Sequence, residues 1–326
     1  MTAKRVAEIL SRAASKRVLV IGDLMLDEFV WGKVGRISPE APVPVVEVTG
    51  ESFYPGGAAN VARNLREFVD RTSVIGVVGQ DRGGQQLREL LEKCGIATDS
   101  VIQDETFPTI VKTRIIARQQ QVVRVDREEV RALPADHVAR VLKSIEAALP
   151  EIDAIVFEDY GKGFLSEELV QAVAQRASAA GKIVTADPNP HHNIDWRNMT
   201  AVKPNRNEAF VAAGIPGDDG DIALQQAGQI LLKKWDTRYL LITLGEQGMM
   251  LFERDGSSHH IPTRARQVFD VSGAGDTAIA LFTLALCCEA TAREAAEIAN
   301  HASAVVVGKL GTATVTRDEL LESFDA

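Results

Sequence analysis

The chain is poor in cysteine and has no long apolar run. Its 326 residues include three cysteines, Cys94, Cys287 and Cys288, an odd number without metal-ligand spacing, and we expect all three to be structural. The longest apolar stretch, residues 278–288, is far shorter than the roughly 20 residues that span a bilayer. The first residues have the pattern of an amphipathic helix rather than of a signal peptide. These absences predict a cytoplasmic protein without a membrane partner.

An excess of positive charge is also absent, since the formal net charge is -9 at pH 7. Such a chain is a poor partner for nucleic acid or an anionic membrane, and an anionic small substrate would need local basic residues. With 45% hydrophobic residues the chain can bury one large core or two ordinary ones. We find no internal repeat or linker between domains, and we expect one domain over residues 1–326.

Short apolar runs that end in polar residues recur along the chain. Residues 17–23 form the first, and later runs are mostly separated by helix-like stretches. This alternation predicts an α/β fold with a mostly parallel central sheet and helices on both faces. Ligands of such sheets bind outside the carboxyl ends of the strands. The other expected strands are residues 73–78, 154–157, 183–186, 201–203 and 239–243, with Asp23, Glu158, Asp159, Asp187, Lys203, Asn205 and Thr243 at the carboxyl ends.

Two segments break this alternation and have the pattern of edge β structure. They are residues 43–48 and 109–126, and the second would fold back near Gln119. Together they predict a small β lid, built from about residues 36–54 and 107–126 and inserted twice into the α/β body.

Three basic residues of the second lid segment have the same parity. Lys112, Arg114 and Arg118 would project from one face if they lay on one strand. That face is either solvated surface or a clamp for a phosphate group on a moving lid.

A glycine turn before the apolar run is the most informative motif. Residues 272–276 read Ser-Gly-Ala-Gly-Asp, and a predicted helix follows. The backbone N–H groups of Gly273, Ala274 and Gly275 would converge near the positive end of this helix and form a cradle for an anion. A carboxylate there, Asp276, suits acceptance of a proton from an attacking hydroxyl, the combination that phosphoryl transfer needs.

The same turn also fits the dinucleotide-binding fingerprint, because Gly273, Gly275 and Ala278 have its spacing. That interpretation requires a strand after the helix and an acidic residue about 20 positions later. Residues 291–309 have helical spacing instead, so a helix is expected to follow the helix. A plain helix-capping turn is the other alternative.

A second glycine turn precedes another predicted helix. Gly56 and Gly57 allow the backbone to approach a polyol closely, and Asn60 can donate to and accept from vicinal hydroxyls; an empty turn is the alternative. This segment and residues 270–277 resemble the two signature regions of the ribokinase family of carbohydrate kinases. The likeness covers essentially the whole chain and includes, in order, residues 203–208 and 243–248.

Within that family the chain resembles kinases of D-glycero-D-manno-heptose 7-phosphate, on the ADP-heptose route to the lipopolysaccharide core. The resemblance implies transfer from ATP to the anomeric oxygen, giving the 1,7-bisphosphate. Such kinases are often fused to a nucleotidyltransferase domain, which this chain is expected to lack. A kinase for another sugar or a non-catalytic sugar-binding relative are the alternatives, and the intact Asp276 counts against the second. The segments that carry the likeness are residues 22–27, 31–32, 36–45 and 158–163.

The resemblance also implies roles for individual residues. Asp276 would be the base, and the amides of Gly273 to Gly275 would hold the transferring phosphoryl group. Glu208 would reach Mg²⁺ through water, and a monovalent cation beside the signature turn is a further option. We also expect a homodimer formed through the β lid. The other implied contacts are Asn205, Arg206, Asn207, Glu208, Thr243, Gly245, Asn300 and Ser303 for ATP, and Asp23, Gly56, Gly57, Asn60, Lys112, Arg114, Arg118, Glu158, Lys162 and Asp187 for the sugar phosphate.

Overall fold

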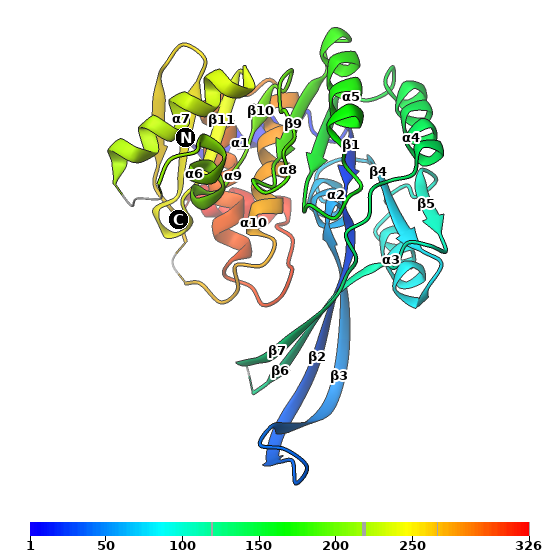
Figure 1. Ribbon diagram of the computed structural model, residues 1–326. Coiled ribbons are helices and arrows are strands. Elements are labelled where there is room, and N and C mark those ends of the chain that lie inside the picture. The colour runs from blue at the N-terminus through cyan, green and yellow to red at the C-terminus, as the bar shows by residue number, and fades with distance from the viewer. Residues whose placement is uncertain (119, 217–219, 266, 326) are drawn as a thin grey trace.

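The body of the protein is built on a nine-stranded, mostly parallel sheet (Figure 1). The computed structural model describes residues 1–118, 120–216, 220–265 and 267–325. In spatial order the strands are β13 (Ser258–Ile261), β12 (Met249–Glu253), β11 (Tyr239–Thr243), β10 (Ala201–Val202), β9 (Ile183–Asp187), β8 (Ala154–Glu158), β1 (Arg17–Gly22), β4 (Arg71–Gly79) and β5 (Val101–Asp104). Strand β12 pairs antiparallel with both β11 and β13, and the other described pairings of this sheet are parallel, so the predicted mostly parallel α/β architecture is confirmed.

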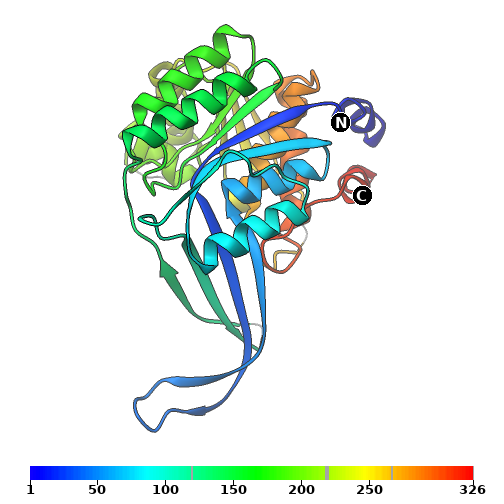
Figure 2. The same ribbon diagram turned by 90° about the vertical axis from the view of Figure 1, so that its right-hand side faces the viewer.

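Helices cover both faces of this sheet (Figure 2). The side chains of β1 alternate between the faces, with Val18 and Val20 in one core cluster and Leu19 and Ile21 in the other. The first cluster includes side chains of α1 (Ala3–Leu10), α2 (Ala58–Arg66), α3 (Arg82–Lys93), α8 (Ala274–Cys287), α9 (Ala292–Val306) and α10 (Arg317–Asp325). The second includes α4 (Ala135–Ala148), α5 (Glu167–Ala179), α6 (Arg206–Ala213) and α7 (Asp221–Trp235).

The apolar run behind the glycine turn forms α8, which is buried along most of its length. The next element in the chain is α9, and the two helices pack together. The dinucleotide-binding interpretation required a strand at this point, so the structure excludes it. No helix in the described part of the chain is long and apolar enough to cross a membrane.

A separate four-stranded sheet projects from the body as the predicted β lid (Figures 1 and 2). Its strands, in spatial order, are β3 (Pro44–Gly57), β2 (Leu24–Ile37), β6 (Ile110–Ala117) and β7 (Gln120–Arg127). The sequence did not predict the long strand β2, which begins directly after Asp23 and pairs with both β3 and β6. Of the turn predicted near Gln119, residue 119 itself lies outside the described residues.

The predicted parity of the three basic lid residues is wrong for Arg118. Strand β6 ends at Ala117, and Arg118 lies in the following turn, exposed and with a φ of 48°. Lys112 and Arg114 do share a face of β6, because the bulge in the β6–β7 ladder comes after them, between Ile115 and Ile116.

Candidate active site

The glycine turn places Asp276 in the buried first turn of α8. Gly273 caps the helix with a φ of 79°, in the left-handed region that favours glycine. A Cβ at Gly273 would also come within 2.7 Å of the Asn60 amide nitrogen. Within the turn, the Ala274 N–H donates to the Val271 carbonyl at 3.2 Å, so one of the three expected cradle amides already has a partner.

Each carboxylate oxygen of Asp276 accepts a hydrogen bond. The Asn60 side-chain amide on α2 donates to Oδ2 at 2.7 Å, and the Tyr160 hydroxyl donates to Oδ1 at 2.9 Å. Burial raises the pKa of Asp276 to about 6, while the two donors act in the opposite direction. Asn60 is fully buried, and its side-chain amide nitrogen is engaged with the Asp276 carboxylate.

A buried charged cluster lies next to Asp276 at the carboxyl ends of β8, β9 and β10. Lys203, directly after β10, forms an ion pair with Asp187 at 2.7 Å. Burial raises the pKa of Asp187 to about 6. Burial also raises the pKa of Glu158 well above its usual value, and the negative charges of Asp187 and Asp276 raise it further. A Cβ at Gly275 would lie 3.4 Å from the Lys203 ammonium, so this cation faces the glycine turn.

The carboxylate of Asp23, expected to orient the sugar, accepts hydrogen bonds from the loop that follows β8. Its two oxygens accept the backbone N–H groups of Tyr160, Lys162 and Phe164 at 2.9, 3.1 and 3.3 Å. The side chain is buried, and burial raises its pKa to about 6. The geometry therefore makes Asp23 an anchor of the loop that follows β8.

Asp27, four residues later, lies between the lid and the glycine turn at Gly56. It forms an ion pair with Arg114, whose guanidinium lies 5.2 Å from the centre of the Phe29 ring. A Cβ at Gly56 would come within 2.5 Å of the Asp27 carboxylate, so the glycine turn and this acid are in close contact. The pattern that could have identified Asp27 was the strand alternation of β2, which places Asp27 and Phe29 on one face.

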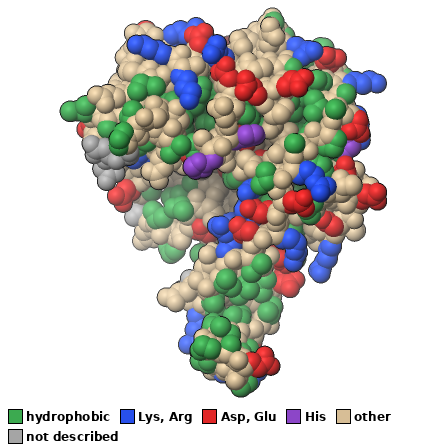
Figure 3. All heavy atoms as spheres, in the orientation of Figure 1, with side chains coloured by type: hydrophobic (Ala, Val, Ile, Leu, Met, Phe, Trp, Pro, Cys, Tyr) green, Lys and Arg blue, Asp and Glu red, His purple; other side chains and the backbone are tan. Residues whose placement is uncertain are grey.

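The other basic residues at the base of the lid are paired with carboxylates. Lys112 lies 3.3 Å from Asp126 and 3.1 Å from Glu128, and Lys162 lies 2.8 Å from Glu128. Figure 3 shows acidic and basic side chains mixed where the lid meets the body. Two of the three basic lid residues, together with Lys162, therefore gather near this junction, while Arg118 lies away from it in the turn after β6.

The residues expected to contact ATP phosphates and Mg²⁺ meet at the start of α6. Asn205 and Glu208 form a capping box, in which the Glu208 N–H donates to the Asn205 side chain at 3.0 Å and the Asn205 N–H donates to the Glu208 carboxylate at 2.6 Å. Thr243, at the end of β11, forms an isolated parallel β-bridge with the backbone of Asn205. Gly245, two residues later, has a φ of 59°. Arg206 hydrogen-bonds Gln247 beside them, and Asn207 is exposed.

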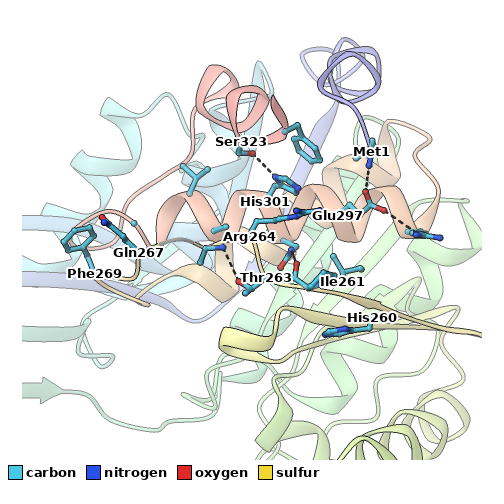
Figure 4. Close-up of a pocket in the computed structure, with 18 residues that line it drawn as sticks. Met1, His260, Ile261, Thr263, Arg264, Gln267, Phe269, Glu297, His301 and Ser323 are labelled. Carbon is cyan, nitrogen blue, oxygen red and sulfur yellow. Dashed lines mark hydrogen bonds and ion pairs between the residues drawn. The ribbon is translucent and has the colours of Figure 1, made fainter. Parts of the chain in front are cut away.

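A cleft of about 1000 Å³ separates α9 from the segment that follows β13. In Figure 4, Glu297 and His301 of α9 lie opposite Thr263 and Arg264. Asn300 lines this cleft and donates to the Pro262 carbonyl at 2.8 Å. One turn along α9, the Ser303 hydroxyl donates to the Ala274 carbonyl at 3.1 Å, which ties the cleft to the glycine turn.

The residues near the glycine turn and α6 suit Mg²⁺ chemically. No group of three or more His, Cys, Asp or Glu side chains in the described residues is arranged to hold a metal ion. Mg²⁺ with a nucleotide commonly uses only one or two protein carboxylates, with phosphate and water oxygens as its other ligands. Glu208, half-buried at the start of α6, is a carboxylate of this kind.

Comparison with known proteins identifies the family of the chain. The family model of the pfkB family of carbohydrate kinases matches residues 15–319. The bifunctional protein HldE of Citrifermentans bemidjiense is 42% identical over 321 residues, which cover 98% of this chain and 66% of that protein. HldE of Magnetococcus marinus is 45% identical over 314 residues, covering 94% and 63%. The chain thus spans just under two thirds of the length of these curated relatives.

Solved structures share the fold at low sequence identity. Arabidopsis thaliana ribokinase complexed with ribose and ATP has a TM-score of 0.72 and 19% identity, with 95% of this chain and 99% of that chain covered. Phosphofructokinase-2 from Escherichia coli in complex with potassium has a TM-score of 0.77 and 17% identity, with coverages of 95% and 98%. Together with the family match over residues 15–319, these findings show that the chain belongs to the pfkB family of carbohydrate kinases and is an ATP-dependent sugar kinase.

Proposed function

We propose that the chain transfers a phosphoryl group from ATP to the anomeric oxygen of D-glycero-D-manno-heptose 7-phosphate, giving the 1,7-bisphosphate on the route to ADP-heptose for the lipopolysaccharide core. The observation that carries this proposal is the buried Asp276 carboxylate at the amino end of α8. The cations where the lid meets the body support the choice of a phosphorylated sugar. The relatives named HldE align with nearly the whole chain, including the segments that resemble heptose 7-phosphate kinases.

In this proposal Asp276 removes the proton from the anomeric hydroxyl. Its two oxygens offer about four lone-pair positions, so one remains on each oxygen after Asn60 and Tyr160 have donated. With a pKa of about 6, most of the carboxylate is ionised at neutral pH and can act as a general base.

The triphosphate would extend from the cleft beside Asn300 to the glycine turn. There the positive end of α8 and the Lys203 ammonium face the same point, and both stabilise negative charge on the transferring phosphoryl group. Glu208 and Asn205 would hold Mg²⁺ through water, and the ion would neutralise charge on the phosphate oxygens. A monovalent cation beside Asp270 and Ser272 remains a further expectation of the resemblance.

The phosphate of the sugar would bind where the lid meets the body. Arg114, Lys112 and Lys162 are already paired there with Asp27, Asp126 and Glu128. A dianionic phosphate can replace some of these carboxylates around the cations, since charge-assisted bonds to phosphate are at least as strong. Asp27 and the backbone at Gly56 and Gly57 would contact the sugar hydroxyls.

A panel assay tests the substrate. ADP release would be measured with heptose 7-phosphate, the unphosphorylated heptose, fructose 6-phosphate and ribose as acceptors. We expect the kcat/KM for heptose 7-phosphate to exceed that for the unphosphorylated heptose and for ribose by at least about a hundredfold, since these two acceptors carry no distal phosphate for the lid cations. It should also exceed the kcat/KM for fructose 6-phosphate, whose shorter carbon chain holds its phosphate in a different position. A higher kcat/KM for a hexose phosphate would replace the proposal with the alternative of a different sugar kinase.

A further inference from the structure

The loop that joins β8 to α5 carries a tyrosine that reaches the proposed base. Tyr160 donates its hydroxyl to the Asp276 carboxylate at 2.9 Å. Burial, together with the charge of Asp276, raises the pKa of Tyr160 well above its usual value, so the phenol stays protonated and acts as a donor. The hydroxyl is therefore a fixed hydrogen-bond donor on one oxygen of this carboxylate.

Two buried carboxylates hold this loop in place. Asp23 accepts the N–H groups of Tyr160, Lys162 and Phe164, and Asp159 accepts the Gly161 N–H at 2.8 Å. Asp159 also contacts the His192 ring nitrogen at 3.0 Å. Neither carboxylate touches Asp276 directly, so any effect on it passes through the loop.

The backbone of the loop leaves little freedom for other arrangements. Gly161 and Gly163 have φ values of 66° and 100°, which side chains rarely adopt. A Cβ at Gly163 would also overlap the Arg131 carbonyl, because the loop packs against that backbone. The position of the Tyr160 ring is thus set by the backbone as well as by its own contacts.

We propose that Tyr160 is a positioning residue for Asp276, and that Asp23 and Asp159 act through it by fixing the loop from residue 159 to 164. This inference rests on the proposed function, because it requires Asp276 to be the base. Tyr160 orients the carboxylate so that a free lone pair meets the anomeric hydroxyl, and its donation favours the ionised form.

Several groups around Asp276 act against its ionised form, and the Tyr160 hydroxyl is among those that favour it. Glu158 of β8 and Asp187 of β9 lie near Asp276, and burial also opposes its negative charge. Lys203 and the Asn60 amide favour the charge, as Tyr160 does. Loss of the phenol hydroxyl would therefore raise the pKa of Asp276 further above its present position.

The test is the substitution Tyr160→Phe, which removes the hydroxyl and keeps the ring. With the best acceptor of the panel, we expect kcat to fall about tenfold and KM for ATP to stay unchanged. The acidic limb of the kcat profile should move to higher pH by about one unit, the effect of one hydrogen bond to a charged group. Tyr239→Phe is the matched control, because Tyr239 lies on β11 and has no contact with Asp276 in the described structure. This variant should leave kcat and the position of the acidic limb unchanged.

A double variant separates this inference from the proposed base. If Asp276→Asn removes most turnover, adding Tyr160→Phe should reduce it little further, because the hydroxyl acts through the carboxylate. An unchanged kcat and acidic limb in Tyr160→Phe, beside an inactive Asp276→Asn, would overturn the positioning role and leave the base intact. Near-normal turnover in Asp276→Asn would instead refute the base itself.

A loop variant tests the part assigned to Asp23. Asp23→Asn should reproduce the lower kcat and the shifted acidic limb, while ATP binding, followed by calorimetry, shows that the fold is kept. A raised KM for the sugar with unchanged kcat would indicate that Asp23 contacts the sugar, and would overturn its role in the loop.

Discussion

Asp276 owes its chemistry to a position that is both buried and supplied with donors. Because burial raises its pKa to about 6, the base loses its charge as the pH falls through that value, and we expect kcat to decline below about pH 6. Asp276→Asn should lower turnover by about 10² to 10⁴, the usual contribution of general-base catalysis, and should abolish this acidic limb. ADP release measured from pH 5 to pH 8 checks both statements. Asp221→Asn, in the exposed first turn of α7, is the matched control.

Arg114 and Arg118 provide a matched pair for the distal phosphate. Arg114 contacts Asp27 at the base of the lid, whereas Arg118 lies in the exposed turn after β6. Arg114→Ala should raise KM for the sugar phosphate by roughly tenfold or more, with little change in KM for ATP, and Arg118→Ala should change neither. Thermal unfolding of both variants is the control. A lower melting temperature with an unchanged KM would mean that Arg114 only neutralises Asp27.

Candidate site residues that lie in a local motif could be predicted from the sequence, whereas their hydrogen-bond partners from distant segments could not. Asp276 and its glycine turn could be predicted because the chemistry depends on a local motif. The Tyr160 hydroxyl reaches Asp276 across 116 positions of the chain, and such a contact leaves no local pattern. Asp27 was not identified because β2 was not recognised, and without that strand the direction of its side chain could not be derived.

At the scale of elements, the start of α6 links helix capping to the expected metal site. Glu208 closes the capping box with Asn205, and glutamine can replace glutamate in such a box. Glu208→Gln should therefore leave the free energy of unfolding nearly unchanged while raising the Mg²⁺ midpoint of the reaction. Magnesium titrations at saturating sugar phosphate measure the midpoint, and urea unfolding measures the stability.

A second capping box serves as the control for this experiment. Glu294 closes the same motif with Thr291 at the start of α9. Glu294→Gln should not alter the magnesium midpoint, although it weakens the contact with Arg5. Equal midpoints in Glu208→Gln and the unmodified chain would remove Glu208 from the metal site.

The elements that could be predicted were those with a strong local pattern. The buried strands β1, β4, β8, β9 and β11 are short apolar runs, and the structure has them within one or two residues of the prediction. The strand β2 lacks such a run in its outer half, where Gly32, Lys33, Gly35 and Arg36 interrupt the apolar residues. Its stability comes from pairing with β3 and β6, which is a property of the assembled lid.

At the scale of the whole molecule, the two faces of the lid differ in character. Asp27, Phe29 and Arg114 share the face that meets the body, where a Cβ at Gly311 would lie 3.8 Å from the Phe29 ring. The opposite face carries Val30, Ile115, Val123 and Val125, which are aligned across β2, β6 and β7. Val123 and Val125 are 45% and 49% exposed, an unusual density of exposed valine for one strand. Figure 3 shows hydrophobic side chains along the projecting lid.

We expect this outer face to pair with the lid of a second copy, so that the protein sediments as a dimer at micromolar concentration. Val123→Asp would place a charge in the middle of the paired faces and should give a monomer over the same concentration range, because an unpaired buried charge costs far more than the contacts gain. Ile222→Asp, at a 77% exposed position on α7, is the control and should leave sedimentation unchanged. An unmodified protein that sediments as a monomer at high concentration would contradict the dimer, whereas a dimer that survives Val123→Asp would place the interface on another surface. A monomeric Val123→Asp variant with unchanged kcat would further show that each lid completes its own site without its partner.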